Sequence, residues 1–226
     1  MLTETLTDFI ERNKARKIFL EHDVKGLLRE VGLPVPKGIF IGGGSEIPPF
    51  HHLQFPLVAK VASSMIRSKS DINGVRLGLK SRKEVGDAVS QLMKIEHAEG
   101  VLIEEMAKPG REVIVGGIID SQFGPVVMFG LGGVFVELFK DVAFGLAPLS
   151  RDGALWLIRQ VKGYRVLGGY RGSPPVDWQS LVGITVAVSE LMATGLIEEM
   201  DLNPVAIYPE GAMVLDAKMS IPSSFD

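Results

Sequence analysis

The order of its secondary-structure signals constrains this chain most: strands and helices are interspersed without strict alternation of strand, helix and strand. Strict alternation would build a doubly wound parallel sheet, and its absence favours an α+β arrangement of two lobes. Helical spacing of apolar residues marks some segments, and short apolar runs between turn residues mark others. The expected helices lie near 6–20, 23–32, 81–98, 152–161 and 177–194, and the expected strands near 38–41, 57–61, 75–79, 101–103, 112–119, 125–129, 134–137 and in a closing C-terminal hairpin.

The chain length suits one compact domain. Its 226 residues leave room for one large domain or for two small subdomains that share a core. Because no internal repeat, long linker or low-complexity tract divides the chain, we expect a single domain over 1–226. Within it we expect N-terminal helices over about 1–35, a first lobe over 36–103 and a second lobe over 104–226.

Composition and charge exclude several classes of partner and chemistry. The formal net charge is -3, and no run of Lys or Arg interleaves with aromatic residues, so neither nucleic acid nor a membrane surface is an expected partner. The absence of cysteine excludes disulfides, thiolate nucleophiles and zinc–thiolate sites. The N-terminus lacks a signal-peptide pattern, and no apolar stretch approaches the ~20 residues that span a bilayer, so a cytoplasmic location is expected.

Oxygen-bearing side chains gather in the C-terminal hairpin. On an extended strand Asp201 and Asn203 project from the same face, because alternate side chains share a face. The next strand returns after the turn at 209–211 and brings Asp216 back to about the same level. Two carboxylates and an amide oxygen are hard ligands that suit Mg²⁺ carried on the phosphates of a nucleotide. The hairpin therefore predicts a magnesium site.

A lysine inside an apolar strand needs an anion or a path to solvent. Lys60 lies between apolar residues of the strand near 57–61, so it binds phosphate or snorkels from an edge strand. The polar loop after it contains Arg67 and Lys69 and ends in Asn73-Gly74, residues that tolerate a positive φ. Its backbone amides suit a triphosphate, although the loop lacks the Walker A spacing and also fits a plain hairpin.

The end of the next strand offers groups for a nucleoside. Glu104 ends an apolar strand, and the backbone groups towards Met106 suit the edge of an adenine. Glu112, a few residues further, suits the ribose hydroxyls. The spacing alone favours the other explanation, a solvated strand terminus.

Two further charged residues lie next to glycines. Glu137 follows the glycines at 132–133, and Arg171 lies in a glycine-rich turn. Each suits a catalytic cleft, and each equally suits a surface charge or a loop salt bridge. All four histidines are expected at the solvated surface, since no Ser/His/Asp or H-E-x-x-H pattern indicates hydrolysis.

Taken together, six stretches of the chain match the pattern of one known family. They are Phe55–Val61, Lys69–Leu79, Gly110–Gly117, Phe123–Phe144, Gly169–Gly172 and Asp201–Pro204, of which Phe123–Phe144 is the most specific. In this order they resemble the ATP-grasp fold, in which two α+β lobes hold the nucleotide between them. More narrowly, the chain resembles the β subunit of the ADP-forming acetyl-CoA (acyl-CoA) synthetases, relatives of succinyl-CoA synthetase.

The resemblance implies a role for each candidate residue. Lys60 would hold the nucleotide phosphates, and the loop from Lys69 to Gly74 would cover them. The remaining roles are an adenine contact for Glu104 and the backbone near Met106, a ribose contact for Glu112, and Mg²⁺ ligation by Asp201, Asn203 and Asp216. The hypothesis counts Lys60, Glu137 and Arg171 as catalytic residues. Lys60 would help to spread the charge of the γ-phosphoryl group, and Glu137 and Arg171 would position an incoming phosphohistidine segment.

The resemblance also implies the reaction and the partner. In this family an acyl-CoA, phosphate and ADP give the free acid, CoA and ATP, reversibly, by way of a phosphohistidine. The CoA site and that histidine lie on a separate α subunit, so this chain would be the nucleotide half of a hetero-oligomer of the α2β2 type. Neither the acid nor the choice of ADP over GDP follows from the sequence.

One position departs from the family pattern. The loop usually begins with His-Lys, whereas this chain has Ser68-Lys69, and a serine hydroxyl is no phosphoryl carrier of the imidazole kind at neutral pH. The chain would then transfer phosphate directly to the α-subunit histidine, use another group, or be impaired. Two alternatives therefore stay open: a nucleotide-binding regulatory subunit without transfer activity, and a stand-alone ATP-grasp carboxylate ligase.

Overall fold

The computed structural model describes residues 2–133, 140–170 and 172–222. The chain divides into a small unit, Leu20–Gly26 with Pro36–Lys108, and a large unit, Met1–Phe19, Leu27–Val35 and Pro109–Asp226. The N-terminal segment 1–35 is thus shared between the two units. Each unit combines helices with an antiparallel sheet, which confirms the predicted α+β class. Over the described ranges, none of the helices has both the length and the apolar character needed to span a bilayer.

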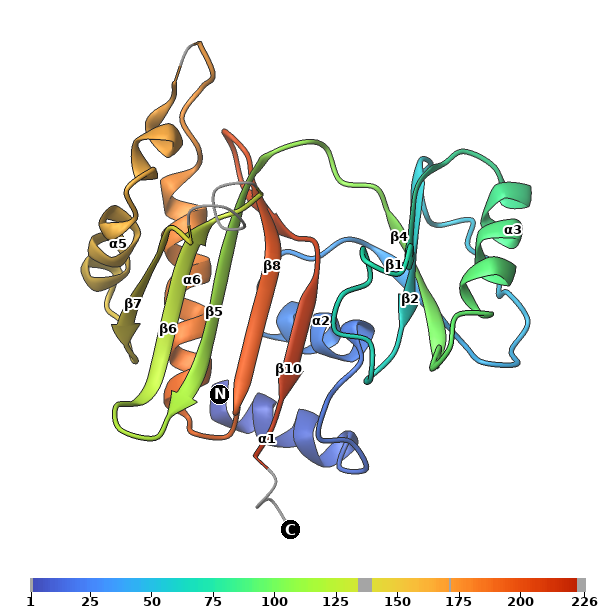
Figure 1. Cartoon of the computed structure of the whole chain (residues 1–226), viewed down its shortest axis with the longest axis horizontal. Helices are drawn as coiled ribbons and strands as arrows, with labels where there is room; N and C mark the ends of the chain where they lie inside the picture. Colours follow the sequence, from blue (N-terminus) through green and yellow to red (C-terminus); the bar gives the residue numbers. More distant parts are fainter. Residues whose placement is uncertain (1, 134–139, 171, 223–226) are drawn as a thin grey trace. The chain divides into compact units, whose positions relative to one another are not determined.

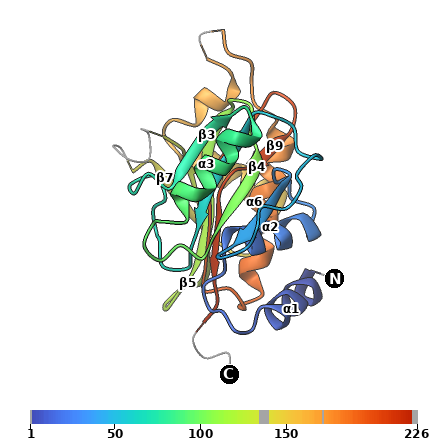
Figure 2. The ribbon, with the colours of Figure 1, turned by 90° about the vertical axis from the view of Figure 1, so that its right-hand side faces the viewer.

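The small unit is built on a four-stranded sheet. Its strands β1 (Gly38–Gly42), β2 (Leu57–Ala62), β3 (Val75–Leu79) and β4 (Gly100–Glu105) pair in the order β1-β4-β2-β3. Helix α3 (Arg82–Leu92) packs across one face of this sheet, where Val85 joins Leu57 and Ile103 in a buried core (Figure 2). The helix was predicted to begin near Ser81, and Ser81 caps α3, since its side chain accepts a hydrogen bond from the Glu84 backbone N–H. The helix ends at Leu92, short of the predicted 98.

The other face of the small sheet carries the first half of α2 (Glu21–Glu30). The ring of His22 stacks on Phe40 of β1 with 3.7 Å between ring centroids. Alternation along β2 buries Ala59 against α3 and turns Lys60 towards α2, where its Nζ lies 2.8 Å from Glu21 Oε1. The side chain of Lys60 is therefore held inside the unit by α2.

The large unit is built on a six-stranded sheet in the order β10-β8-β5-β6-β7, with β9 also pairing to β8. The strands are β5 (Arg111–Asp120), β6 (Gly124–Leu131), β7 (Val142–Leu146), β8 (Glu199–Ile207), β9 (Ala212–Val214) and β10 (Ala217–Ser220). The strands predicted near 112–119 and 125–129 are present as β5 and β6, which pair as a hairpin. Its turn is held by Asp120, whose Oδ1 accepts from the backbone N–H of Gln122 and Phe123.

Helices cover one face of the large sheet. Helix α6 (Trp178–Ala193) runs along β5 and β6 (Figure 1), and α5 (Arg151–Gln160) packs beside it. A Cβ at Gly117 of β5 would lie 2.6 Å from Cγ of Met192, so a glycine allows α6 to approach the sheet. Val113 and Val115 point to the same side as Gly117 and are fully buried.

Several elements differ from the sequence-based expectation. Helix α1 (Leu2–Arg12) ends at Arg12, where the spacing predicted a helix to 20, because the side-chain amide of Asn13 donates to the Phe9 carbonyl at 2.9 Å and closes the last turn. Strand β7 and the short 3-10 helix η1 (Tyr164–Gly168) were not predicted. The predicted strand at 134–137 lies outside the described residues.

Replacing Asp177 with Ala is expected to lower the melting temperature by a few degrees at pH 7, with a deficit that shrinks as the pH falls from about 4 to about 2. Asp177 caps α6, and hydrogen bonds from the backbone N–H groups of Ser180 (3.0 Å) and Gly211 (2.8 Å) lower the pKa of its carboxyl to about 2. An unfolded aspartate titrates near about 3.9, so the ionised form stabilises the folded state above that pH and the contribution is lost on acidification.

Thermal unfolding of the wild type and the Asp177→Ala variant, followed by circular dichroism between pH 2 and pH 7, measures this effect. A deficit of equal size at both ends of the pH range would contradict the assignment. The bond from Gly211 also ties the turn between β8 and β9 to α6, so the same carboxylate fixes the hairpin that carries Asp216.

Candidate functional site

The predicted metal ligands lie close together in the large sheet, with Asp201 and Asn203 on the face opposite α6 and the backbone of Asp216 beside them. In β8, Asp201 and Asn203 flank the fully buried Leu202, which points to the α6 side. The backbone N–H of Asn203 donates to the Asp216 carbonyl at 3.2 Å, so Asp216 lies directly beside Asn203. Asp201 pairs with Gly116 of β5 on one side and with Lys218 of β10 on the other. Since directly opposed residues share a face, Lys218 joins the three predicted ligands.

The chemistry of this set fits a hard cation. Among the residues that the structure describes, no three His, Cys, Asp or Glu side chains gather in a way that could hold a metal ion by themselves. The set instead comprises the carboxylates of Asp201 and Asp216 and the amide of Asn203, three oxygen donors. Mg²⁺ usually takes one or two protein carboxylates and fills its octahedron with water and substrate phosphates. The site thus suits a metal that arrives with a phosphate-bearing ligand.

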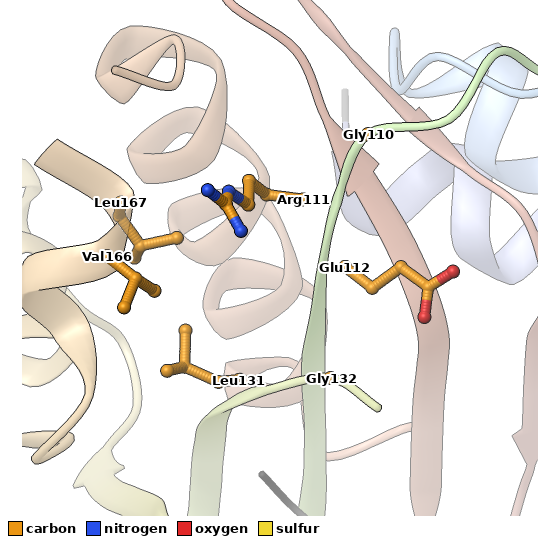
Figure 3. Close-up of a pocket in the computed structure, with 7 residues that line it drawn as sticks. All are labelled: Gly110, Arg111, Glu112, Leu131, Gly132, Val166 and Leu167. Atoms are coloured by element: carbon orange, nitrogen blue, oxygen red, sulfur yellow. The ribbon is translucent and has the colours of Figure 1, made fainter. Parts of the chain in front are cut away.

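Glu112 lies on the same face of the same sheet. Arg111 and Glu112 are neighbours on β5 and point to opposite sides (Figure 3). Arg111 points into a pocket of about 210 Å³ with Val166 and Leu167, whereas the exposed carboxylate of Glu112 points away from it. Alternation along β5 puts Glu112 on the side of Gly116, whose partner is Asp201.

Gly132 allows the chain after β6 to pass close to Glu112. Its backbone N–H donates to the Glu112 carbonyl at 2.8 Å, and a Cβ at this position would lie 2.8 Å from Cβ of Glu112. Any side chain at 132 would displace Glu112, so the glycine here is a requirement of close packing. This explains one glycine of the Gly132-Gly133 pair in structural terms.

In the small unit, Lys60 and Glu104 belong to a buried cluster of charges. The cluster, here called the lysine–glutamate cluster, consists of Glu21, Lys25, Lys60, Lys69 and Glu104. Lys60 Nζ lies 2.8 Å from Glu21 Oε1 and 2.7 Å from Glu104 Oε2. Lys25 Nζ lies 2.8 Å from Glu21 Oε1 and 2.6 Å from Glu104 Oε1. Lys69 Nζ lies 2.9 Å from Glu21 Oε2, so every member contacts at least one opposite charge.

Burial and ion pairing shift the pKa values of these groups in opposite directions. Burial alone would raise the pKa of Glu21, but the ammonium groups of Lys60, Lys25 and Lys69 outweigh it and hold that pKa well below its usual range. For Lys25, burial is the largest effect and lowers its pKa, although the two carboxylates oppose it. Glu21 is therefore ionised at neutral pH.

The loop after β2 is folded onto the strand by Gly74. The Gly74 N–H donates to the Lys69 carbonyl at 2.6 Å, and the Val61 N–H donates to the Gly74 carbonyl at 2.8 Å. A Cβ at Gly74 would lie 2.6 Å from Cγ1 of Val61 and 2.8 Å from the Lys69 carbonyl oxygen. Asn73 takes a left-handed φ of 53°, the conformation that the Asn-Gly pair predicted. Ser68 is exposed, whereas the neighbouring Lys69 is buried.

Some predicted residues lie away from open surface or outside the described chain. The carboxylate of Glu104 is 3% exposed and paired with two lysines, so its predicted contact with an adenine stays a prediction. Met106 is 39% exposed, and its backbone N–H donates to the Pro56 carbonyl. Glu137 and Arg171 lie outside the described residues.

Two members of the cluster, Glu21 and Lys25, were not predicted from the sequence. The available signal was their spacing: a Glu four residues before a Lys on a helix is a favourable ion pair. That spacing is common on solvated helix surfaces, so it does not reveal burial.

The sequence of the chain matches the model of a known domain family. A family model described as an ATP-grasp domain matches residues 11–221. The two antiparallel units, the oxygen set on β8 and the lysine of β2 thus occur in a chain that belongs to the ATP-grasp domain family.

Two curated relatives show to which group of ATP-grasp proteins the chain is similar. The chain is 40% identical over 222 residues to the β subunit of ADP-forming acetate–CoA ligase I of Pyrococcus furiosus, covering 94% of this chain and 96% of that one. It is 44% identical over 205 residues to ADP-forming acetate–CoA ligase II of Archaeoglobus fulgidus, covering 90% of this chain but only 30% of that protein. The chain therefore belongs to the family of the ADP-forming acetate–CoA ligases, and it spans 30% of the length of the Archaeoglobus ligase.

A solved relative has the same fold. The acetyl-coenzyme A synthetase 1 of Ca. Korarchaeum cryptofilum, in complex with coenzyme A and Ca-AMPCP, has a TM-score of 0.84 and 38% identity, covering 96% of this chain and 98% of that one. Another structure of that synthetase contains Mg-AMPPCP and a phosphohistidine segment pointing towards the nucleotide site, with a TM-score of 0.79 and 38% identity over 98% of this chain and all of the other.

Proposed function

We propose that this chain is the nucleotide-binding subunit of an ADP-forming acyl-CoA synthetase of the acetate–CoA ligase type. It would exchange a phosphoryl group between an adenine nucleotide and a phosphohistidine on a CoA-binding α subunit. The observation that carries this proposal is that Asp201, Asn203 and Glu112 share one face of the large sheet while the backbone of Asp216 lies beside Asn203. Similarity to β subunits of ADP-forming ligases supports the reaction class.

Three residues of the large unit would hold Mg²⁺. Asp201, Asn203 and Asp216 offer the hard oxygen donors, and the bound metal would neutralise charge on the nucleotide phosphates. Glu112 would accept hydrogen bonds from the ribose hydroxyls, since its carboxylate is exposed on the same face. The Mg-AMPPCP bound to the Korarchaeum synthetase supports a magnesium–nucleotide complex as the ligand.

Lysines of the small unit would hold the phosphates. Lys60 and Lys69 carry fixed ammonium groups, and Gly74 lets the intervening loop fold back on β2. In phosphoryl transfer the protein mainly positions the reactants and stabilises charge, so fixed cations suit the task. The backbone near Met106 remains the proposed adenine contact.

The partner would supply the phosphohistidine. In the direction of ATP formation, the bond between phosphorus and the histidine nitrogen breaks and a bond to a β-phosphate oxygen of ADP forms. Glu137 and Arg171 are proposed to position that segment. A hetero-oligomer of the α2β2 type and a cytoplasmic location complete the proposal.

Ser68 favours direct transfer between the nucleotide and the α-subunit histidine. The exposed hydroxyl stands where the family pattern described above usually has a histidine, and it lies next to a lysine whose side chain is buried. The same serine motivates the second candidate, a nucleotide-binding regulatory subunit without transfer activity. The stand-alone carboxylate ligase is the third.

A labelling experiment separates the three candidates. The purified chain is mixed with [γ-³²P]ATP, Mg²⁺ and a CoA-binding α subunit, and acid-labile label on the α-subunit histidine is measured. We expect label on that histidine, and none when the α-subunit histidine is replaced by Asn. Nucleotide binding without label would favour the regulator, and acyl phosphate formed without any partner would favour the stand-alone ligase.

A further inference from the structure

One buried carboxylate joins three lysines from three different segments of the small unit. Glu21 in the first turn of α2 contacts Lys25 of the same helix, Lys60 of β2 and Lys69 of the loop that follows β2. Its side chain is 2% exposed. Charge pairs that are shielded from water are stronger than surface pairs and tolerate less displacement. The position of Glu21 is therefore coupled to the positions of both proposed phosphate-binding lysines.

The side chains of the cluster differ in how much of each is exposed to solvent. The carboxylate-bearing side chains of Glu21 and Glu104 are 2–3% exposed, whereas the side chains of Lys60 and Lys69 are 11% and 9% exposed. The negative groups thus lie deeper than these two lysines. A nucleotide phosphate would meet the ammonium groups first and would be shielded from carboxylate repulsion.

Lys25 has a different position in the same cluster. It is 2% exposed and contacts both Glu21 and Glu104, as Lys60 does, so the two lysines and two glutamates close a ring of alternating charge. Two buried carboxylates this close would repel each other, and Lys25 offsets that repulsion from inside the unit. Lys25 therefore supports the ring without taking part in a phosphate contact.

We propose that Glu21 is a positioning residue: it sets the Nζ atoms of Lys60 and Lys69 at the places where they bind the β- and γ-phosphates, and it fixes the loop to β2. The proposal rests on the proposed function, since it needs a nucleotide at these lysines. Glu21 itself does not touch the nucleotide. Its effect on binding passes through the two lysines.

The test measures ATP and AMP affinity in the presence of Mg²⁺ for the wild type and for Glu21→Gln, which keeps the size of the side chain but removes its charge. We expect ATP to bind about tenfold more weakly or worse, and AMP, which lacks the β- and γ-phosphates, to change by less than about twofold. The matched control is Glu30→Gln, an exposed glutamate on the same helix, with both affinities unchanged.

A double-mutant cycle tells a positioning role from general destabilisation. If Glu21 acts through Lys69, the double variant Glu21→Gln with Lys69→Met should lose no more ATP affinity than the worse single variant. Additive losses, or equal losses for ATP and AMP, would overturn the proposal.

Folding and nucleotide binding are checked separately. Should Glu21→Gln fail to fold by circular dichroism, the variant Glu21→Gln with Lys25→Met removes a balanced pair of buried charges, and the same ATP and AMP comparison is made on it. If this double variant bound ATP with the affinity of the wild type, Glu21 would not position the lysines. Absence of ATP binding by the wild type itself would instead refute the proposed function.

Discussion

Replacing Asp216 with Asn is expected to reduce Mg²⁺-dependent phosphoryl transfer by at least about a hundredfold. Changes to residues that merely orient metal ligands already cost about 10–100-fold, and Asp216 is proposed as a ligand itself. The substitution keeps the size of the side chain and removes a negative charge beside Asn203. Asn203→Ala should behave similarly, because it removes the amide oxygen from the same set. Transfer rates and ATP affinities are measured over a Mg²⁺ titration.

The matched control is Glu210→Gln. Glu210 is an exposed carboxylate in the turn between β8 and β9, on the hairpin that precedes Asp216, so its loss removes the same charge without touching the proposed site. We expect wild-type Mg²⁺ dependence from the control. If Asp216→Asn and Asn203→Ala both kept the wild-type Mg²⁺-dependent affinity for ATP, the metal site would be wrong.

Lys60→Met is expected to combine a large loss of activity with a large loss of stability. The activity loss follows because Lys60 is proposed to bind the nucleotide phosphates. The stability loss follows because Glu21 and Glu104 keep only their other lysine partners once this ammonium is gone. Breaking a buried pair costs roughly 3 kcal/mol or more, which corresponds to a fall in melting temperature of about 6 °C or more for a chain of this size.

An exposed ion pair provides the comparison. Arg12 and Glu30 also form a bidentate pair with a closest distance of 2.8 Å, but their side chains are 56% and 41% exposed. We expect Arg12→Met to leave the melting temperature and the transfer rate almost unchanged, because solvent screens such pairs. Thermal melts of Lys60→Met and Arg12→Met, run side by side, decide whether burial or ion pairing alone makes the lysine–glutamate cluster stabilising. Equal shifts would contradict the argument.

The predictions for the large unit came from local patterns. Alternation along the strands placed Asp201 and Asn203 on one face, and the structure brings the backbone of Asp216 beside Asn203 as the hairpin pattern required. The extra residue in β8 between Leu202 and Val205, opposite Val113–Val115 of β5, was not visible in the sequence. Local periodicity was sufficient here because the contacts join adjacent strands.

The partners of Lys60 could not be predicted from local sequence patterns. The sequence established that a lysine inside an apolar strand needs an anion, and it suggested a nucleotide phosphate. In the folded chain the anions at Lys60 are Glu21, 39 positions earlier, and Glu104 of the adjacent strand. Glu104 was expected near an adenine because a strand end is usually open, and its ion pair with Lys25 of α2 was not visible in the sequence.

By itself, the sequence determined the α+β class, the start of α3 near Ser81, the Asn73-Gly74 turn and the family, because each depends on neighbouring residues or on a residue pattern. Only the tertiary structure decided which charges meet inside the small unit. Glu21, Lys69 and Glu104 lie far apart along the chain, and nothing local distinguishes a buried ion pair from a solvated one. Burial is a property of the packed elements, and burial gives these charges their mutual strength.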